Sequence, residues 1–386
     1  MQRPDYRGGS IVNLMSSLVT GLGGRATGYP ALRALDPGRV AAARRVVLLV
    51  IDGLGYDFLV GQLAGAALRA GLVDRIDSVF PPTTATAVTT FLTGLAPRQH
   101  GLVGWYTYLR EAGTVATVLP YTARYGRLSL AAAGVSAAAL YGLTPVFDRV
   151  PVACAAVLPA HIADSEVSRA LGGRARRVAY RSLGGLFRRT LEAVRRSAGR
   201  AFVYVYWAEL DRLAHRHGVT SPQVAAHLAE LDARFAAFLT ALAGTDTLLV
   251  VAADHGFIDV PRAHRLRLED FPGLADALVL PLCGEPRTVY CYVRPRRAGR
   301  FAEDVATSLG AAAQARPSDA LIEEDWFGIG DTHPRLAERV GDWTLLMGDG
   351  YALTDRLVGE RPHPMVGFHG GTTPAEMRVP LMIWHV

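Results

Sequence analysis

The chain has 386 residues and half of them are hydrophobic, so it is long enough for one large α/β domain or for a core with an inserted lobe. Its net charge of +6 comes from arginine without any lysine, and no run of basic residues predicts a nucleic-acid track. Three cysteines without close spacing argue against a disulfide scaffold or a cysteine–zinc site, and no apolar stretch reaches the ~18 residues of a membrane span. We therefore expect a cytoplasmic protein.

The first strong element is a buried strand. Residues 1–44 are predicted to form an N-terminal arm with a short helix over 10–20. Residues 46–51, VVLLVI, are then apolar without alternation, which is typical of a parallel strand buried on both faces. The run ends at Asp52. In open α/β sheets ligands collect at the carboxyl ends of strands, so this carboxylate is well placed for chemistry.

A threonine-rich segment follows about thirty residues later. We expect a helix over 55–70, a short strand over 74–80, and a new helix over 83–92 after two prolines. The first turn of that last helix contains Thr83, Thr84 and Thr86. Free N–H groups at a helix start suit a phosphate, although one of these threonines could equally be only an N-cap.

The middle of the chain alternates strands with helices. We expect strands over 115–119, 150–157, 202–207 and 247–253, and helices over 131–141, 183–198 and 221–242. This alternation predicts an α/β fold with a mostly parallel central sheet between helices. Residues 258–345 break the rhythm, so we expect them to form an inserted cap lobe. Residues 1–257 and 346–386 would then form the catalytic core.

Carboxylate and imidazole side chains follow three of these strands, and a further histidine lies near the C-terminus. They are Asp52, Asp211, His215, Asp254, His255 and His369. Asp211 and His215 are four residues apart, so on a helix they face the same way. Six such side chains suit two divalent ions of the zinc type, bound by nitrogen and oxygen without thiolate. Each residue alone could be an ordinary turn or surface residue, and we assign no role to His100 or His363.

The ordered motifs resemble a known family. They are VVLLVIDGLGYD, FPPTTATAVTTFLTG, ELDRLAHRHG, AADHGF and FHGGTTPAEMRVPLMIW. This order is similar to that of the alkaline phosphatase superfamily, and particularly to its type I phosphodiesterase/nucleotide pyrophosphatase branch. The resemblance extends from about residue 46 to the C-terminus. It implies an alkaline phosphatase-like fold and a hydrolase that uses two divalent ions, with zinc expected and manganese or iron as alternatives.

The resemblance also implies a role for each residue. The first ion would be bound by Asp52, Asp254 and His255 with Thr84 as a fourth ligand, and the second by Asp211, His215 and His369. Thr84 would be the nucleophile that forms a covalent phosphothreonine, because it lies nine residues before the TG pair at 93–94. The expected substrate is a small phosphorylated molecule such as a nucleotide.

The preferred ester is left open by the sequence. The phosphodiesterase branch that the chain resembles usually has an asparagine three residues after its nucleophile, but this position is Ala87, which offers no polar group to a phosphoryl oxygen. Arg287, in GEPRT, or an arginine of the inserted lobe is expected to contact the substrate instead. A phosphomonoesterase, a phosphonate hydrolase or a sulfatase of the same superfamily are therefore alternatives. A non-catalytic metal-binding module ranks below them, and so does a phosphate-transferring mutase, whose relatives use a serine and a larger inserted domain.

Overall fold

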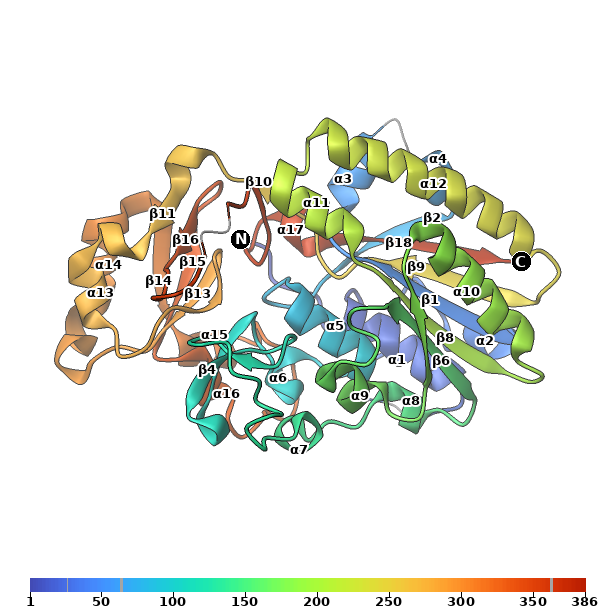
Figure 1. Cartoon of the computed structure of the whole chain (residues 1–386), viewed down its shortest axis with the longest axis horizontal. Coiled ribbons are helices and arrows are strands. Elements are labelled where there is room, and N and C mark those ends of the chain that lie inside the picture. Colours follow the sequence, from blue (N-terminus) through green and yellow to red (C-terminus); the bar gives the residue numbers. More distant parts are fainter. Residues whose placement is uncertain (26, 63–64, 362–363) are drawn as a thin grey trace.

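The computed structural model describes residues 1–25, 27–62, 65–361 and 364–386. It contains two large sheets, each surrounded by helices, and Figure 1 shows them as two lobes side by side. The right-hand lobe carries most of the first 257 residues together with the C-terminal strand. The left-hand lobe is formed mainly by the residues between about 260 and 355.

The sheet of the right-hand lobe has the strand order β2-β18-β9-β1-β8-β6-β7. Its strands are β1 (Arg45–Ile51), β2 (Leu72–Asp77), β6 (Ala153–Pro159), β7 (Arg176–Tyr180), β8 (Ala201–Trp207), β9 (Thr247–Ala252) and β18 (Arg378–His385). β1 pairs in parallel with β8 and β9, whereas β18 runs antiparallel to its neighbours. The sheet is mostly parallel, which confirms the predicted fold class.

β1 lies at the centre of this sheet because it is apolar on both faces. Every residue from Val46 to Ile51 is at most 2% exposed. A strand covered by helices on both sides needs such a continuous apolar run, and each buried valine or leucine side chain contributes about 1.5–3 kcal/mol. The neighbouring strands β8 and β9 are buried in the same way. The three apolar runs were therefore predicted correctly as strands.

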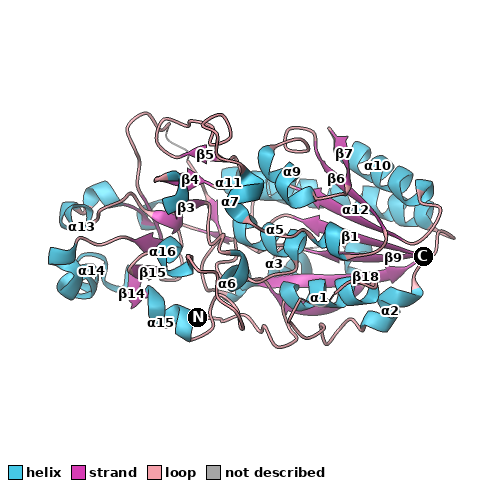
Figure 2. Cartoon of the chain, turned by 90° about the horizontal axis from the view of Figure 1, so that it is seen from below, coloured by secondary structure: helices cyan, strands magenta, loops and turns pink. Residues whose placement is uncertain are grey.

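Helices cover both faces of the sheet. α12 (Pro222–Leu242) begins with Ser221, whose side chain accepts a hydrogen bond from the N–H of Val224, and it has proline at its first position. It packs against α10 (Leu183–Arg196), while α1 (Ile11–Gly21) packs against α5 (Thr84–Thr93) on the opposite side (Figures 1 and 2). Among the helices that the structure describes, none is long and apolar enough to cross a membrane.

The left-hand lobe is organised around a second, antiparallel sheet with the order β14-β15-β13-β12-β3-β4-β5. Its strands are β3 (Tyr106–Leu109), β4 (Thr114–Thr117), β5 (Thr122–Ala123), β12 (Cys283–Glu285), β13 (Thr288–Cys291), β14 (Ala313–Pro317) and β15 (Trp343–Met347). The expected strand over 115–119 thus belongs to this sheet and not to the central one. The division into a core and a lobe of residues 258–345 stays a prediction, to which the structure adds strands from 106–123.

Other expectations also differ from the structure. The helix expected over 131–141 is shorter, because residues 130–134 form turns and α7 spans only Ala137–Tyr141. The single helix expected over 55–70 is two helices, α3 (Tyr56–Gly61) and α4 (Ala66–Arg69). Gly65 begins the second with φ of +86°, a conformation that glycine adopts freely and that interrupts a helix. β7 was not predicted, because this edge strand, RRVAY, begins with two arginines and is mostly exposed or half-buried, so it lacks a continuous apolar run. Residues 63 and 64, within the expected helix, lie outside the described residues.

A short antiparallel pair connects distant parts of the chain near the strand ends. β10 (Ile258–Asp259) follows β9, and β17 (Gly367–Phe368) comes just before the last predicted histidine. Ile258 pairs with Phe368, and Asp259 pairs with Gly367. This pairing brings the segment with His369 next to the segment that carries Asp254 and His255.

Candidate metal centre

The predicted ligands are collected by three adjacent parallel strands. Asp52 follows β1, Asp254 and His255 follow β9, and α11 (Glu209–His217) begins two residues after β8. Because β9, β1 and β8 are neighbours and run in the same direction, their carboxyl ends meet at one edge of the sheet. The structure therefore brings together side chains that are up to 317 residues apart in sequence, from Asp52 to His369.

The first predicted set surrounds the imidazole of His255. Its Nε2 lies 3.3 Å from Asp52 Oδ1, 3.5 Å from Asp254 Oδ2 and 3.2 Å from Thr84 Oγ1. Asp52, Asp254 and His255 are all buried. Ligand atoms from Asp52, Asp254 and His255 lie within 4.8 Å of one another, which is close enough for all three to bind one ion.

The second predicted set lies beside the first. Asp211 Oδ1 is 3.3 Å from His215 Nε2 and 3.8 Å from His369 Nε2, and the two imidazole nitrogens are 3.1 Å apart. His255 is close to both sets, since its ring stacks on that of His369 at 3.8 Å and its Nε2 is 3.9 Å from Asp211 Oδ1. The arrangement is a continuous cluster in which two ions could be neighbours.

Unpartnered atoms show that the cluster fits divalent metal. Asp52 Oδ1, Asp211 Oδ1 and Asp254 Oδ2 are buried and accept no hydrogen bond from the described residues. A buried carboxylate oxygen without a partner is costly, and a bound cation removes that cost. Burial, together with the charges of Asp211 and Asp254, holds the pKa of Asp52 well above its usual value. Three carboxylates this close together repel one another unless a cation lies between them, and this arrangement is typical of a divalent-ion site.

Hydrogen bonds from the far side of two imidazoles orient them for binding. His255 Nδ1 is 3.1 Å from the carbonyl oxygen of Gly256, and His215 Nδ1 is 3.0 Å from that of Gly367. A carbonyl can only accept, so Nδ1 of each ring donates to it and Nε2 is the nitrogen that faces the cluster. Burial and the neighbouring rings of His255 and His215 hold the pKa of His369 well below its usual value, so that imidazole is neutral.

Thr84 differs from its neighbouring threonines. It is the first residue of α5, and its Oγ1 is within hydrogen-bonding distance of His255 Nε2. Thr83 Oγ1 instead donates to Glu285, and Thr86 Oγ1 is buried without a hydrogen bond among the described residues. Of the three hydroxyls in this turn, the structure therefore brings that of Thr84 to the carboxylate–imidazole cluster.

Arg287 has a different environment from the one expected for a substrate-binding residue. Its side chain is fully buried, and its Nε and Nη2 donate to the carboxylate of Glu376 at 2.6 and 2.9 Å. Its Nη1 donates to the carbonyl oxygens of Gly348 and Tyr351. The guanidinium therefore holds α17 (Pro374–Met377), the short helix before β18, to the second sheet. This corrects the expectation that it contacts substrate, because burial and pairing occupy the group.

Removing the guanidinium is expected to destabilise the protein strongly. Arg287→Met would leave the buried Glu376 carboxylate without its cation, a change that typically costs about 3–5 kcal/mol. Urea unfolding of the variant measures the loss. The control is Arg234→Met, which removes the exposed pair with Glu230 and should cost less than about 1 kcal/mol. Equal changes in the two variants would contradict the structural role.

Two residues of the site were not found from sequence. The hydroxyl of Tyr206, in β8, donates to Asp52 Oδ2. Glu285, in β12, is 7% exposed and accepts hydrogen bonds from Thr83 and Trp105. The alternation of aromatic residues in FVYVYW could have indicated a tyrosine facing the end of β1. No local pattern marks Glu285, because its partners lie about 180 to 200 residues earlier in the chain.

His100 is a buried neutral histidine and not a ligand. It is fully buried, and its Nδ1 accepts from the N–H of Leu102 while its Nε2 lies 3.3 Å from Thr90 Oγ1. Burial, with smaller contributions from His333 and Arg339, lowers its pKa to about 3. His363, the other histidine without an assigned role, lies outside the described residues.

The low pKa of His100 predicts acid sensitivity. The unfolded chain binds a proton to this imidazole near pH 6.5 while the folded protein resists it until about pH 3, so stability is present above pH 6.5 and lost as the pH falls between these values. Between pH 7 and 5 this loss is about 2 kcal/mol. Urea unfolding should therefore show that His100→Gln loses about 2 kcal/mol less of its unfolding free energy than wild type between pH 7 and 5. A His161→Gln control, at an exposed position, should keep the wild-type dependence of unfolding free energy on pH.

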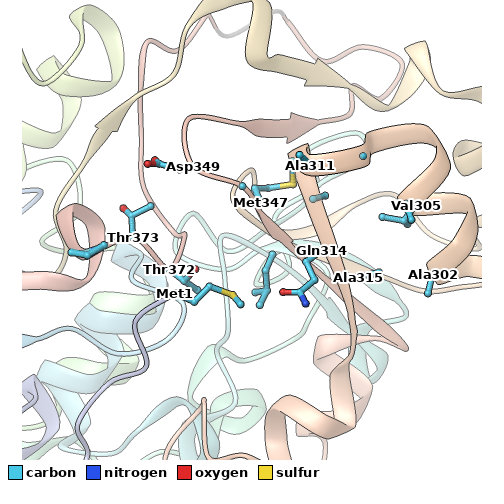
Figure 3. Close-up of a pocket in the computed structure, with 16 residues that line it drawn as sticks. Met1, Ala302, Val305, Ala311, Gln314, Ala315, Met347, Asp349, Thr372 and Thr373 are labelled. Atoms are coloured by element: carbon cyan, nitrogen blue, oxygen red, sulfur yellow. The ribbon is translucent and has the colours of Figure 1, made fainter.

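A separate cavity lies in the left-hand lobe. It has a volume of about 690 Å³ and is lined by α14 (Phe301–Leu309), β14, β15, residues 372–374 and Met1. Figure 3 shows Met1, Gln314, Met347 and Thr372 around it. None of the predicted ligands lines this cavity, and its walls carry mainly alanine and methionine side chains. We therefore place the candidate site at the strand ends and not here.

The chain is similar to known proteins in sequence and in fold. A family model described as type I phosphodiesterase/nucleotide pyrophosphatase matches residues 46–372. The fold is similar to that of murine ectonucleotide pyrophosphatase/phosphodiesterase 5, with a TM-score of 0.65, 16% identity and coverage of 87% of each chain. An inactive threonine-to-alanine form of the murine protein in complex with AMP has the same TM-score and identity, covering 88% of this chain and 87% of that one.

The human counterpart is equally similar in fold. It has a TM-score of 0.65 at 15% identity and covers 88% of this chain and 87% of its own. A search of curated proteins finds no match. At these identities the structural neighbours establish a shared fold, whereas the family model covers most of the chain.

Proposed function

We propose that this chain, which belongs to the type I phosphodiesterase/nucleotide pyrophosphatase family and is a hydrolase of phosphate esters, acts with two divalent ions and through a covalent intermediate on Thr84. The observation that carries the proposal is the convergence of seven side chains at three strand ends. They are Asp52, Thr84, Asp211, His215, Asp254, His255 and His369. Zinc is the expected metal, because the donors are nitrogen and oxygen without thiolate.

Each ion would have its own ligands. Asp52, Asp254, His255 and Thr84 would hold one, and Asp211, His215 and His369 would hold the other. When bound, divalent ions lower the pKa of a coordinated hydroxyl and stabilise the negative charge that develops on attacking and leaving oxygens. The three carboxylates, of which those of Asp52 and Asp254 are buried, supply negative charge, and the three imidazoles supply nitrogen donors.

The chain itself would contribute the nucleophile and the oxyanion contacts. Thr84 Oγ1 attacks phosphorus, a bond forms between them, and the bond from phosphorus to the leaving oxygen breaks. The N–H groups of Thr84 and Ala85, at the start of α5, have no acceptor among the described residues and could bind phosphoryl oxygens. Water then attacks the phosphothreonine, which releases the phosphoryl product and restores the hydroxyl.

The substrate is proposed to be a phosphodiester or pyrophosphate of a small nucleotide. The family description supports this class, and so does the AMP bound by the inactive murine protein of the same fold. In that protein the inactivating change replaces a threonine by alanine, which is consistent with a threonine nucleophile here.

A substrate panel tests the proposal. Purified protein supplied with zinc or manganese should hydrolyse bis-p-nitrophenyl phosphate or a nucleotide 5′-p-nitrophenyl ester faster than the matched phosphate monoester, phosphonate and sulfate esters. A higher rate on one of these three would assign the chain to a different ester within the superfamily. Metal analysis provides the second measurement, because a protein that retains no divalent ion and cleaves no ester would be a non-catalytic module.

A further inference from the structure

Glu285 connects the two lobes at the start of the nucleophile helix. It is the last residue of β12 in the second sheet, and its side chain is buried. Its Oε1 accepts a hydrogen bond from Thr83 Oγ1 at 2.6 Å and another from the N–H of Trp105 at 2.7 Å. None of the roles proposed above uses this carboxylate.

The backbone beside the second ligand set also contacts Glu285. Gly370, next to His369, has φ of +97°, and a Cβ placed on it would lie 2.8 Å from the Cβ of Glu285. The carbonyl oxygen of Gly370 accepts from Thr288 Oγ1 at 2.6 Å, and Thr288 pairs with Glu285 across the β12–β13 hairpin. Glu285 therefore lies between the first turn of α5 and the segment with His369.

The hydrogen bond to Glu285 determines what the first turn of α5 exposes. Thr83 is the N-cap residue of this helix, yet its side chain accepts no hydrogen bond from the helix. Threonine in this position usually accepts from one of the first N–H groups. Here the hydroxyl is directed to Glu285 instead, and the N–H groups of Thr84 and Ala85 keep no protein acceptor within the described part of the chain.

We propose that Glu285 is a positioning residue that holds Thr83 away from capping α5, so that the first N–H groups of the helix remain available to the phosphoryl group attacked by Thr84. This inference rests on the proposed function. An open helix N-terminus favours an anion through both its N–H donors and its dipole. The class of ligand is a tetrahedral oxyanion such as phosphate or a phosphate ester.

A purely structural role explains the arrangement less well. Burial raises the pKa of Glu285 to about 7, even though the hydrogen bonds from Thr83 and Trp105 favour the charged form. A buried acid at this position is therefore costly to stability. That cost is understandable if the acid, which accepts a hydrogen bond from the residue directly before the nucleophile, orders the site.

The test compares variants that free or remove the Thr83 hydroxyl. Glu285→Ala leaves this hydroxyl free to cap α5, and we expect kcat/KM for the phosphodiester to fall about 10-fold to 100-fold. Inorganic phosphate, measured by calorimetry on the metal-loaded protein, should bind about 10-fold more weakly. Glu285→Gln retains an acceptor for Thr83 and should keep most of both quantities. The double variant Glu285→Ala/Thr83→Val has no hydroxyl that could cap the helix, so it should recover most of what Glu285→Ala loses.

A matched variant separates positioning from general destabilisation. Thr89→Val removes a buried hydroxyl of the same helix, one that donates to the carbonyl oxygen of Ala85, and should leave catalysis and phosphate binding unchanged. If Glu285→Ala behaves like Thr89→Val, or if the double variant recovers nothing, the inference is overturned. Wild-type protein that hydrolyses none of the esters would contradict the proposed function, whereas the phosphate-binding comparison would still decide the inference.

Discussion

Thr84→Ala protein is expected to lose at least about 10³-fold in kcat on phosphodiesters, because the residue removed is the proposed nucleophile of the covalent intermediate. The hydroxyl of Thr84 is the one in its turn that lies beside the cluster, at 3.2 Å from His255 Nε2. No neighbouring hydroxyl can replace it, since that of Thr83 is directed to Glu285 and that of Thr86 is buried inside the helix packing.

The control for this change keeps the nucleophile. Thr84→Ser retains a hydroxyl on the same backbone and should keep a substantial part of the activity, while Thr84→Ala should still bind metal through Asp52, Asp254 and His255. The measurements are steady-state hydrolysis of bis-p-nitrophenyl phosphate and the metal content of each purified protein. Full activity in a metal-loaded Thr84→Ala protein would refute the assignment of the nucleophile.

Removal of divalent metal is expected to abolish hydrolysis and to lower stability together. The buried oxygens of Asp52, Asp211 and Asp254 without hydrogen bonds would repel one another in the metal-free protein. A ligand that binds only the folded state stabilises it by about 4 kcal/mol when its free concentration is a thousand times its dissociation constant. Thermal unfolding with and without a chelator measures this difference, and added zinc or manganese should restore both activity and stability.

A ligand variant provides the matched control for chelation. Asp254→Asn keeps the size of the side chain but removes one negative charge from the first set, so it should bind less metal and respond less to the chelator. Wild-type protein that keeps its unfolding temperature and its activity after complete chelation would show that these side chains do not hold a required metal. In that case the buried carboxylates would need another explanation.

Several elements could be predicted because their signals are local. The apolar runs 46–51, 202–207 and 247–253 cannot be placed anywhere but in a covered sheet, and β1, β8 and β9 form there. α12 was predicted with its N-cap and its proline, since both signals are within a few residues of the helix start. The six carboxylate and imidazole residues stood out for the same reason, as each follows an apolar run or a glycine turn.

Other features depend on contacts between distant residues. The strand at 114–117 has a short, mixed pattern that fits either sheet, and only its pairing with β3 and β5 assigns it to the second one. Arg287 was expected to face a substrate, but the buried carboxylate of Glu376, 89 residues later, pairs with it. Nothing near Arg287 in the sequence indicates that partner.

The sequence by itself determined the α/β class, the three central strands and the types of ligand that follow them, because hydrophobic periodicity and residue chemistry act over short distances. Only the tertiary structure decided how these parts meet. Adjacent parallel pairing of β9, β1 and β8 brings Asp52, Asp211 and Asp254 together, and the β10–β17 pair adds His369. The tertiary structure also determines that the first N–H groups of α5 have no side-chain cap, since Thr83 donates to Glu285, 202 residues later in the chain, and no local pattern predicts this hydrogen bond.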